Sequence, residues 1–219
     1  MDHWNGQLLK RTLGVSILIF DDVEVLDFCG PFEVFSVTGG REGLRPFAVH
    51  TVAEEERPIT ARGGLSINAR YRFDNCPAAD ILLVPGGPGT RRELDNRKII
   101  CWIKERACDA RLVLSVCSGS LLLAKSGLLD GLAATTHHGA IDELRSISPN
   151  VQVDAASRFV DNGRVISSGG ISAGIDMSLH VVARLLGSEQ ALETARYMEY
   201  EWNHGALGRV EHNGGSCVG

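Results

Sequence analysis

Short apolar runs, separated by polar or glycine-rich segments, recur along the chain, and three of them predict buried strands. These runs are Gly14–Phe20, Ile81–Val84 and Arg111–Val116. They are short and rich in branched aliphatic residues, which is typical of a strand covered by helices on both faces. The pattern therefore predicts the centre of a parallel sheet.

Further strands are predicted around this centre. Phe47–Ala53 has strand composition, and Pro58–Phe73, with Gly63-Gly64 between two alternating segments, indicates a hairpin at the sheet edge. An Asn162-Gly163 turn indicates a second hairpin nearer the C-terminus. The short strands expected in that part of the chain are Ala133–Thr136, Val151–Val153, Phe159–Val160 and Val165–Ser168.

Helical segments alternate with the strands. A polar loop, Asp21–Gly30, precedes Pro31, and proline at a first-turn position predicts a helix that runs to Val37 before Gly39. The other expected helices are residues 95–107, 118–126, 140–146, 172–186 and 189–200. Alternating strands and helices predict an α/β fold, in which a doubly wound, mostly parallel sheet carries helices on both faces. We expect a single domain over residues 1–219, with its core at about 13–202.

Composition narrows the class of protein. The chain has 219 residues, 44% hydrophobic and 22% charged, as in ordinary globular proteins. Its net charge of −5 argues against nucleic-acid binding. No apolar run is long enough to span a membrane, and Met1–Lys10 lacks a signal core, so we expect a cytoplasmic protein. The six cysteines form no CxxC pair and fit no zinc spacing, so we expect neither a disulfide nor a metal site.

The strongest chemical signal surrounds Cys117. The strand ending at Val116 runs into Cys117, and Ser118-Gly119-Ser120 then leads into a helix. This order is typical of a nucleophile elbow, a tight turn that presents a reactive side chain at the carboxyl edge of the sheet. The free N–H groups and the dipole of the helix are expected to lower the pKa of the thiol. The alternative is a buried cysteine that only fills space.

Two further segments end at the same edge of the sheet. Pro85–Gly89 (PGGPG) follows a buried strand, and its backbone N–H groups suggest an oxyanion-stabilising role for Gly87, although a tight turn would also need these glycines. Asp27 lies between apolar residues after the first strand. Burial would raise the pKa of its carboxyl group, which could then share a proton with Cys117 or with substrate; the alternative is a helix N-cap.

His137 and Ile171 are weaker candidates. His137 follows a short strand within Thr135–His138, where both a site role and a structural role are open. No acidic residue at helical spacing supports metal binding by the adjacent histidines. Ile171 lies in a strand, glycine-rich turn and helix start at Ser168–Asp176, where it is expected to form a pocket wall.

Together these segments resemble the ThiJ/PfpI-like superfamily, which has the class I glutamine-amidotransferase-like, flavodoxin-like fold. The similarity runs from about residue 13 to 202 and rests on LDFCGPFEVF (26–35), DILLVPGGPG (80–89), VCSGSLLLAKSGLLDG (116–131), TTHH (135–138), SSGGISAGIDMSLHVV (167–182) and YMEYEW (197–202). The set is most similar to the isonitrile hydratase branch, and it also resembles the amino-terminal domains of certain AraC-type regulators.

The resemblance implies roles for particular residues. It implies a nucleophile at Cys117, an acidic partner at Asp27 and backbone donors at Gly87 and Ser118; we also expect Gly30 in the substrate-binding set. In isonitrile hydratases a threonine follows the cysteine; Ser118 keeps its hydroxyl group but lacks its methyl group. Peptidases and chaperones of the superfamily usually have histidine there, so Ser118 argues against peptidase activity. A homodimer without a metal or organic cofactor is also implied.

The function expected from these features is hydration of a small molecule. In an isonitrile hydratase-like lyase, Cys117 would attack the isonitrile carbon and Asp27 would deliver the proton. Two alternatives stay open: a non-catalytic ligand or redox sensor, and a glyoxalase- or deglycase-like enzyme.

Overall fold

The computed structural model describes residues 11–40, 43–203 and 208–211. The expectations for Met1–Lys10 therefore lie outside the described residues. The main sheet has eight strands in the order β12-β10-β11-β7-β6-β1-β2-β5. Their bounds are β1 Leu13–Leu18, β2 Phe47–Ala53, β5 Tyr71–Arg72, β6 Ile81–Val84, β7 Leu112–Val116, β10 Phe159–Asp161, β11 Val165–Ser168 and β12 Gly208–Val210.

Every neighbouring pair in this sheet is parallel except β10 and β11, which form the antiparallel hairpin predicted at Asn162-Gly163. All residues of β6, β7 and β11 are buried, as expected for strands covered on both faces. Two small sheets complete the strands: β3 (Ile59–Thr60) pairs with β4 (Ser66–Ile67), and β8 (Ala133–Ala134) pairs with β9 (Gln152–Val153).

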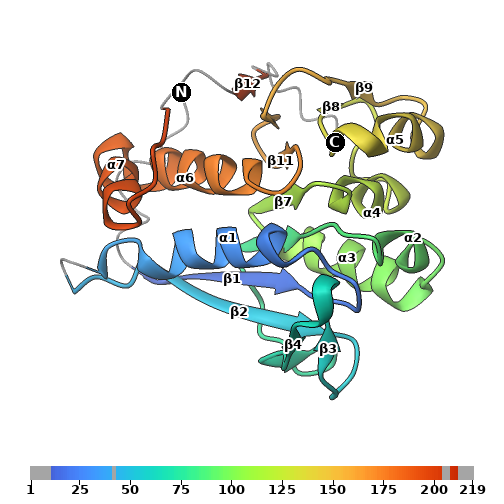
Figure 1. The fold of residues 1–219 in the computed structure, drawn as a ribbon, viewed down its shortest axis with the longest axis horizontal. Coiled ribbons are helices and arrows are strands. Elements are labelled where there is room, and N and C mark those ends of the chain that lie inside the picture. Colours follow the sequence, from blue (N-terminus) through green and yellow to red (C-terminus); the bar gives the residue numbers. More distant parts are fainter. Residues whose placement is uncertain (1–10, 41–42, 204–207, 212–219) are drawn as a thin grey trace.

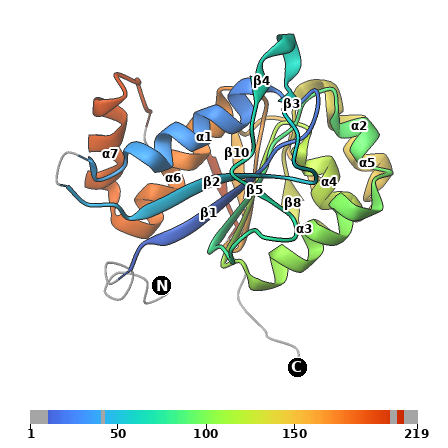
Figure 2. The same cartoon turned by 90° about the horizontal axis from the view of Figure 1, so that it is seen from below.

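Helices cover both faces of the main sheet (Figures 1 and 2). On one face lie α1 (Val25–Val37), α6 (Ala173–Leu186) and α7 (Ser188–Tyr197), and on the other α2 (Thr90–Glu93), α3 (Arg97–Asp109), α4 (Gly119–Lys125) and α5 (Ile141–Ile147). Short 3₁₀ turns occur at Arg62–Gly64 and His138–Ala140. The predicted doubly wound α/β fold is confirmed. Among the described residues, no helix has the length and apolar character needed to cross a membrane.

The largest error in the predicted elements is at the start of α1. The loop expected at Asp21–Gly30 ends early, because the helix begins at Val25 and Pro31 lies inside it. Proline removes one helical hydrogen bond, but Phe28, Pro31 and Phe35 are buried in the interior, and this packing offsets the loss. The correction moves Asp27 from a loop into the first turn of a helix.

The edges of the sheet also differ from the prediction. The β3–β4 hairpin forms a separate sheet, and the edge strand of the main sheet is β5, parallel to β2. At the opposite edge, β12 pairs with β10 and extends the sheet beyond residue 202. All three residues of β12 are exposed. An exposed strand needs no apolar pattern, so the sequence of β12 did not predict it.

Candidate active site

Cys117 lies on the turn between β7 and α4. Its φ of 58° is in the left-handed region, which is uncommon for a residue with a side chain. The turn is held from both ends. The Cys117 N–H donates to the carbonyl oxygens of Ser168 and Gly169, each at 3.1 Å, and the Cys117 carbonyl oxygen accepts from the Thr136 hydroxyl at 3.0 Å. Tertiary hydrogen bonds thus maintain a conformation that costs about 1–3 kcal/mol on its own.

A glycine after the cysteine allows this turn to approach β6. A Cβ atom on Gly119 would lie 2.1 Å from the Val84 carbonyl oxygen, well inside van der Waals contact. A small residue is therefore required where α4 begins. The predicted nucleophile elbow is present as a strand-to-helix turn at the carboxyl edge of the sheet.

Asp27 interacts with the Cys117 thiol and is completely buried. Its Oδ2 accepts the Gly86 N–H at 3.1 Å, whereas its Oδ1 has no hydrogen-bond partner within the described residues. Burial raises the pKa of the carboxyl group to about 7, and the nearby Glu24 carboxylate adds to the rise; the Cys117 thiol and the N–H groups of Gly86 and Ile171 oppose it. As expected, Asp27 is a carboxyl group that can hold a proton near neutral pH.

Cys117 is only 7% exposed, and burial is the main reason that the pKa of its thiol rises to about 12. The Asp27 carboxylate raises the pKa further, while the N–H and hydroxyl groups of Ser118 oppose the rise. The predicted lowering of this pKa is therefore wrong, because desolvation and a neighbouring anion outweigh the helix N-terminus. Since two negative charges are unfavourable here, a thiolate requires the proton to be on Asp27.

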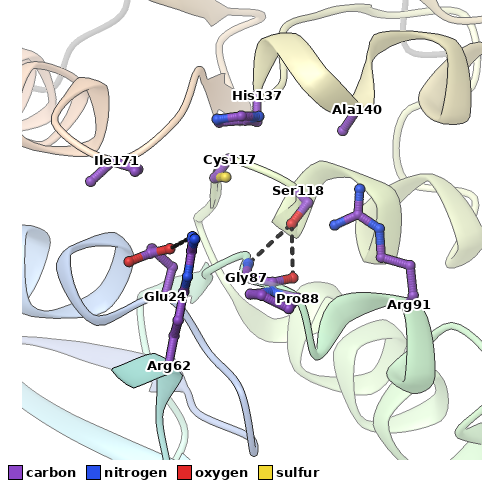
Figure 3. A pocket seen from close by; sticks show the side chains of 10 residues that line it. All are labelled: Glu24, Arg62, Gly87, Pro88, Arg91, Cys117, Ser118, His137, Ala140 and Ile171. Atoms are coloured by element: carbon purple, nitrogen blue, oxygen red, sulfur yellow. Dashed lines mark hydrogen bonds and ion pairs between the residues drawn. The ribbon is translucent and has the colours of Figure 1, made fainter. Parts of the chain in front are cut away.

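A pocket of about 360 Å³ opens above Cys117 (Figure 3). Its lining residues are Glu24, Arg62, Gly87, Pro88, Arg91, Cys117, Ser118, His137, Ala140 and Ile171. The fold thus brings together five of the seven predicted site residues. Asp27 is buried and is not among the lining residues. Gly30 is in α1, where its added Cβ would meet Ile175 of α6 at 2.9 Å, so it serves helix packing rather than lining the pocket.

The Ser118 hydroxyl group is directed into the loop that precedes α2. Its Oγ accepts the Gly87 N–H at 3.0 Å and lies 3.0 Å from the Thr90 hydroxyl oxygen. Thr90 in turn donates to the Gly87 carbonyl oxygen at 2.7 Å. The N–H expected to stabilise an oxyanion is thus bonded to Ser118, and Ser118 is a positioning residue for this loop.

His137 lies above Cys117 in Figure 3. Its Nδ1 accepts the Gly139 N–H at 3.1 Å, so in the neutral ring the proton is assigned to Nε2, which is then a donor. Burial, with smaller contributions from His138 and Arg91, lowers the pKa of the ring. A Cβ on Gly170 would lie 2.2 Å from the His137 Cδ2, so the ring occupies space that only glycine leaves open.

Ile171 lines the same pocket and has a strained backbone. Its φ is 58°, an outlier for a β-branched residue, and its N–H is one of the groups that stabilise the Asp27 carboxylate. Strain at Cys117 and Ile171 converges on one pocket, which is typical of functional sites.

The sequence did not indicate the charged residues of the pocket. Arg62 reaches it from the β3–β4 hairpin, where its Nη1 lies 2.6 Å from the Glu24 Oε2. Arg91 reaches it from α2 and pairs with Glu143 of α5, with 2.6 Å between Nη2 and Oε2. A possible signal was Arg91's place just after the PGGPG segment. Within the described residues, no three His, Cys, Asp or Glu side chains gather where they could hold a metal ion.

The DJ-1/PfpI family profile matches residues 14–184, which is most of the chain. The chain belongs to the DJ-1/PfpI family. It is 34% identical to the isonitrile hydratase of Pseudomonas putida over 188 residues, covering 86% of this chain and 78% of the relative.

The chain is also similar to a transcriptional regulator and to a solved structure of a ThiJ/PfpI family protein. The HTH-type transcriptional regulator GbdR of Pseudomonas aeruginosa is 29% identical over 192 residues, covering 88% of this chain but only 52% of the regulator. The crystal structure of a ThiJ/PfpI family protein from Pseudomonas syringae superposes with a TM-score of 0.79 at 27% identity, covering 94% of this chain and 84% of that chain. Members similar to this chain thus include both an enzyme and a regulator.

Proposed function

We propose that the protein is a cysteine-dependent hydratase that converts a small isonitrile and water into an N-substituted formamide. The observation that carries this proposal is the buried pair at the pocket, in which Asp27 and the Cys117 thiol together hold a transferable proton. The similarity to a bacterial isonitrile hydratase supports the choice of substrate.

In the first step, the Cys117 sulfur forms a bond to the terminal isonitrile carbon, using the sulfur lone pair. The same carbon takes a proton from Asp27, and the thiol proton replaces it on the carboxyl group. The product is a thioimidate, R–N=CH–S–Cys. The raised pKa of Asp27 suits this transfer, because a general acid works best when its pKa lies near the working pH.

In the second step, water adds to the thioimidate carbon and the nitrogen takes up a proton. The carbon–sulfur bond then breaks, the hydroxyl proton leaves, and the formamide R–NH–CHO departs while Cys117 regains its proton. His137 can donate from Nε2 to the substrate nitrogen, because its Nδ1 is occupied by the Gly139 N–H.

The test is turnover of simple isonitriles by wild type beside Cys117→Ala, with the formamide detected by mass spectrometry. We expect Cys117→Ala to abolish turnover. Cys101→Ala is the matched control, because Cys101 is exposed on α3, and it should match wild type. Full activity in Cys117→Ala would exclude the mechanism.

The similarity to the regulator GbdR favours a second candidate, a ligand or redox sensor. Cys117 would then bind a ligand or accept oxygen without turnover. Intact-mass analysis after mild peroxide distinguishes the two: addition of two or three oxygens at Cys117, with no isonitrile turnover, favours the sensor. Methylglyoxal in the same screen tests the glyoxalase- or deglycase-like alternative, and light scattering tests the expected homodimer.

A further inference from the structure

We propose that the pocket selects isonitriles that carry a carboxylate group, which Arg62 and Arg91 recognise. This inference rests on the proposed function and adds the substrate class. The two guanidinium groups lie on either side of Cys117 in Figure 3, so a ligand whose reactive carbon is at the sulfur has a cation within the pocket on both flanks.

Backbone hydrogen bonds hold Arg62 at the pocket. The Arg62 N–H donates to the Val23 carbonyl oxygen at 2.9 Å, and the Asp22 N–H donates to the Thr60 carbonyl oxygen at 2.8 Å. These bonds fasten the β3–β4 hairpin to the loop before α1, far from it in sequence. The backbone of Arg62 is thus fixed beside the pocket, while its side chain, 60% exposed, stays open to solvent and ligand.

Both arginines keep donors after their ion pairs are made. Arg62 bonds Glu24 through Nη1 alone, and Arg91 bonds Glu143 through Nε and Nη2. Within the part of the chain that the structure describes, Nε and Nη2 of Arg62 and Nη1 of Arg91 make no hydrogen bond to protein. A guanidinium has five N–H donors, so each arginine can also donate to a ligand carboxylate as a second partner.

The charges of the lining residues favour an anion. The lining carries two cations, Arg62 and Arg91, and one carboxylate, Glu24, while Glu143, the partner of Arg91, lies outside it. Both arginines contribute to lowering the pKa of His137 above Cys117, after burial and His138, while Glu24 opposes them. Their field therefore reaches the space where substrate would lie. At about 360 Å³ the pocket is near the lower end of ligand sites, about 300–1,000 Å³, which suits a short-chain acid.

The experiment compares isocyanoacetate with its methyl ester, which has the same reactive group without the charge. We expect wild type to prefer the acid in kcat/KM, and Arg62→Gln and Arg91→Gln each to reduce the acid-to-ester ratio by about tenfold, the effect of one charge-assisted hydrogen bond. Arg62→Lys keeps the positive charge, so its acid-to-ester ratio should lie between those of Arg62→Gln and wild type. Glu24→Gln, which removes a negative charge from the lining, should raise it.

The matched control is Arg145→Gln on α5, an exposed arginine paired with Asp142 outside the pocket lining, and its ratio should equal that of wild type. A wild-type enzyme that prefers the ester, with ratios unaffected by either pocket substitution, would overturn the inference and leave the hydratase proposal standing.

A binding measurement separates failure of the inference from failure of the proposed function. Cys117→Ala is titrated calorimetrically with N-formylglycine and with its methyl ester. Tighter binding of the acid, lost in the double variants with Arg62→Gln or Arg91→Gln, supports anion recognition even if neither isonitrile is turned over. Equal binding of the acid and the ester would overturn the inference that the pocket recognises a carboxylate.

Discussion

The thiol of Cys117 stabilises the carboxylate of Asp27, and that carboxylate in turn raises the pKa of the thiol. Both groups are buried, and one carboxyl oxygen has no hydrogen-bond partner within the described residues. The pair therefore tolerates one negative charge far better than two. Removing either member should change the chemistry of the other.

Asp27→Asn tests this coupling. The amide has the size of the carboxyl group but cannot deliver a proton, so we expect isonitrile turnover to fall by about 10²–10⁴-fold, the usual contribution of a general acid. The pKa of Cys117 should also fall, because the neighbouring carboxylate that raises it is gone. The rate of Cys117 alkylation by iodoacetamide as a function of pH measures this shift.

The control for Asp27→Asn is Glu33→Gln, on the exposed side of the same helix. It should leave both turnover and the alkylation profile as in wild type. An Asp27→Asn protein whose Cys117 alkylates with the wild-type pH profile would show that the two groups are not coupled.

The pH dependence of stability gives a second test of Asp27. Its pKa is about 7 when folded and near the ordinary value of 3.8 when unfolded. Between these two pH values, Asp27 is protonated in the folded state but ionised in the unfolded state. The free energy of unfolding therefore falls as the pH rises towards 7, and it then levels off. Between pH 5 and pH 8 this group should remove about 2–3 kcal/mol of stability.

Urea denaturation at pH 5, 6, 7 and 8 measures the effect, with Asp27→Asn as reference because its amide does not titrate. The difference between wild type and variant removes the contributions of the other titrating groups. Parallel stability curves for the two proteins would contradict the raised pKa.

The centre of the fold was predictable from sequence because burial leaves a direct pattern there. β6 has the predicted bounds, and the elbow at Cys117 follows from an apolar strand that meets small residues. The start of α1 was not predictable: Pro31 usually marks a helix start, and only tertiary packing makes it an interior residue.

The chemistry of the site was predictable only in part. The sequence predicted that Asp27 and Cys117 interact, and the structure brings them together, but the direction of the thiol's pKa shift depends on burial and on a neighbouring charge, which single-sequence patterns do not measure. Arg62 and Glu24 are 38 positions apart, and their pairing depends on the hairpin docking beside α1. No local spacing rule anticipates such a contact.

Ser118→Ala should mainly loosen the loop before α2. The substitution leaves the buried Gly87 N–H without its acceptor, and we expect a loss of about 1–3 kcal/mol in the free energy of unfolding. Turnover should fall because the loop that lines the pocket is loosened, although Cys117 itself is unchanged. Ser118→Thr keeps the hydroxyl group and should retain more stability than alanine.

Chemical denaturation of Ser118→Ala and Ser118→Thr measures this effect, with Ser146→Ala on the exposed side of α5 as control. A stable Ser118→Ala protein with reduced turnover would instead assign the hydroxyl group a direct role with substrate.

Gly170→Ala tests the position of His137 without removing it. The new methyl group would lie 2.2 Å from the His137 Cδ2, so the ring must leave its place above Cys117. If His137 donates to the substrate, Gly170→Ala should lower kcat by about 10²-fold or more, and His137→Ala should lower it equally. Gly169→Ala is the matched control, because its added Cβ would come no closer than 3.6 Å to the nearest neighbouring atoms, an ordinary contact. Its kcat should therefore equal that of wild type.

Equal activity in Gly170→Ala and Gly169→Ala would show that the His137 ring is not needed at its position above Cys117, and that the isonitrile nitrogen takes its proton from another group.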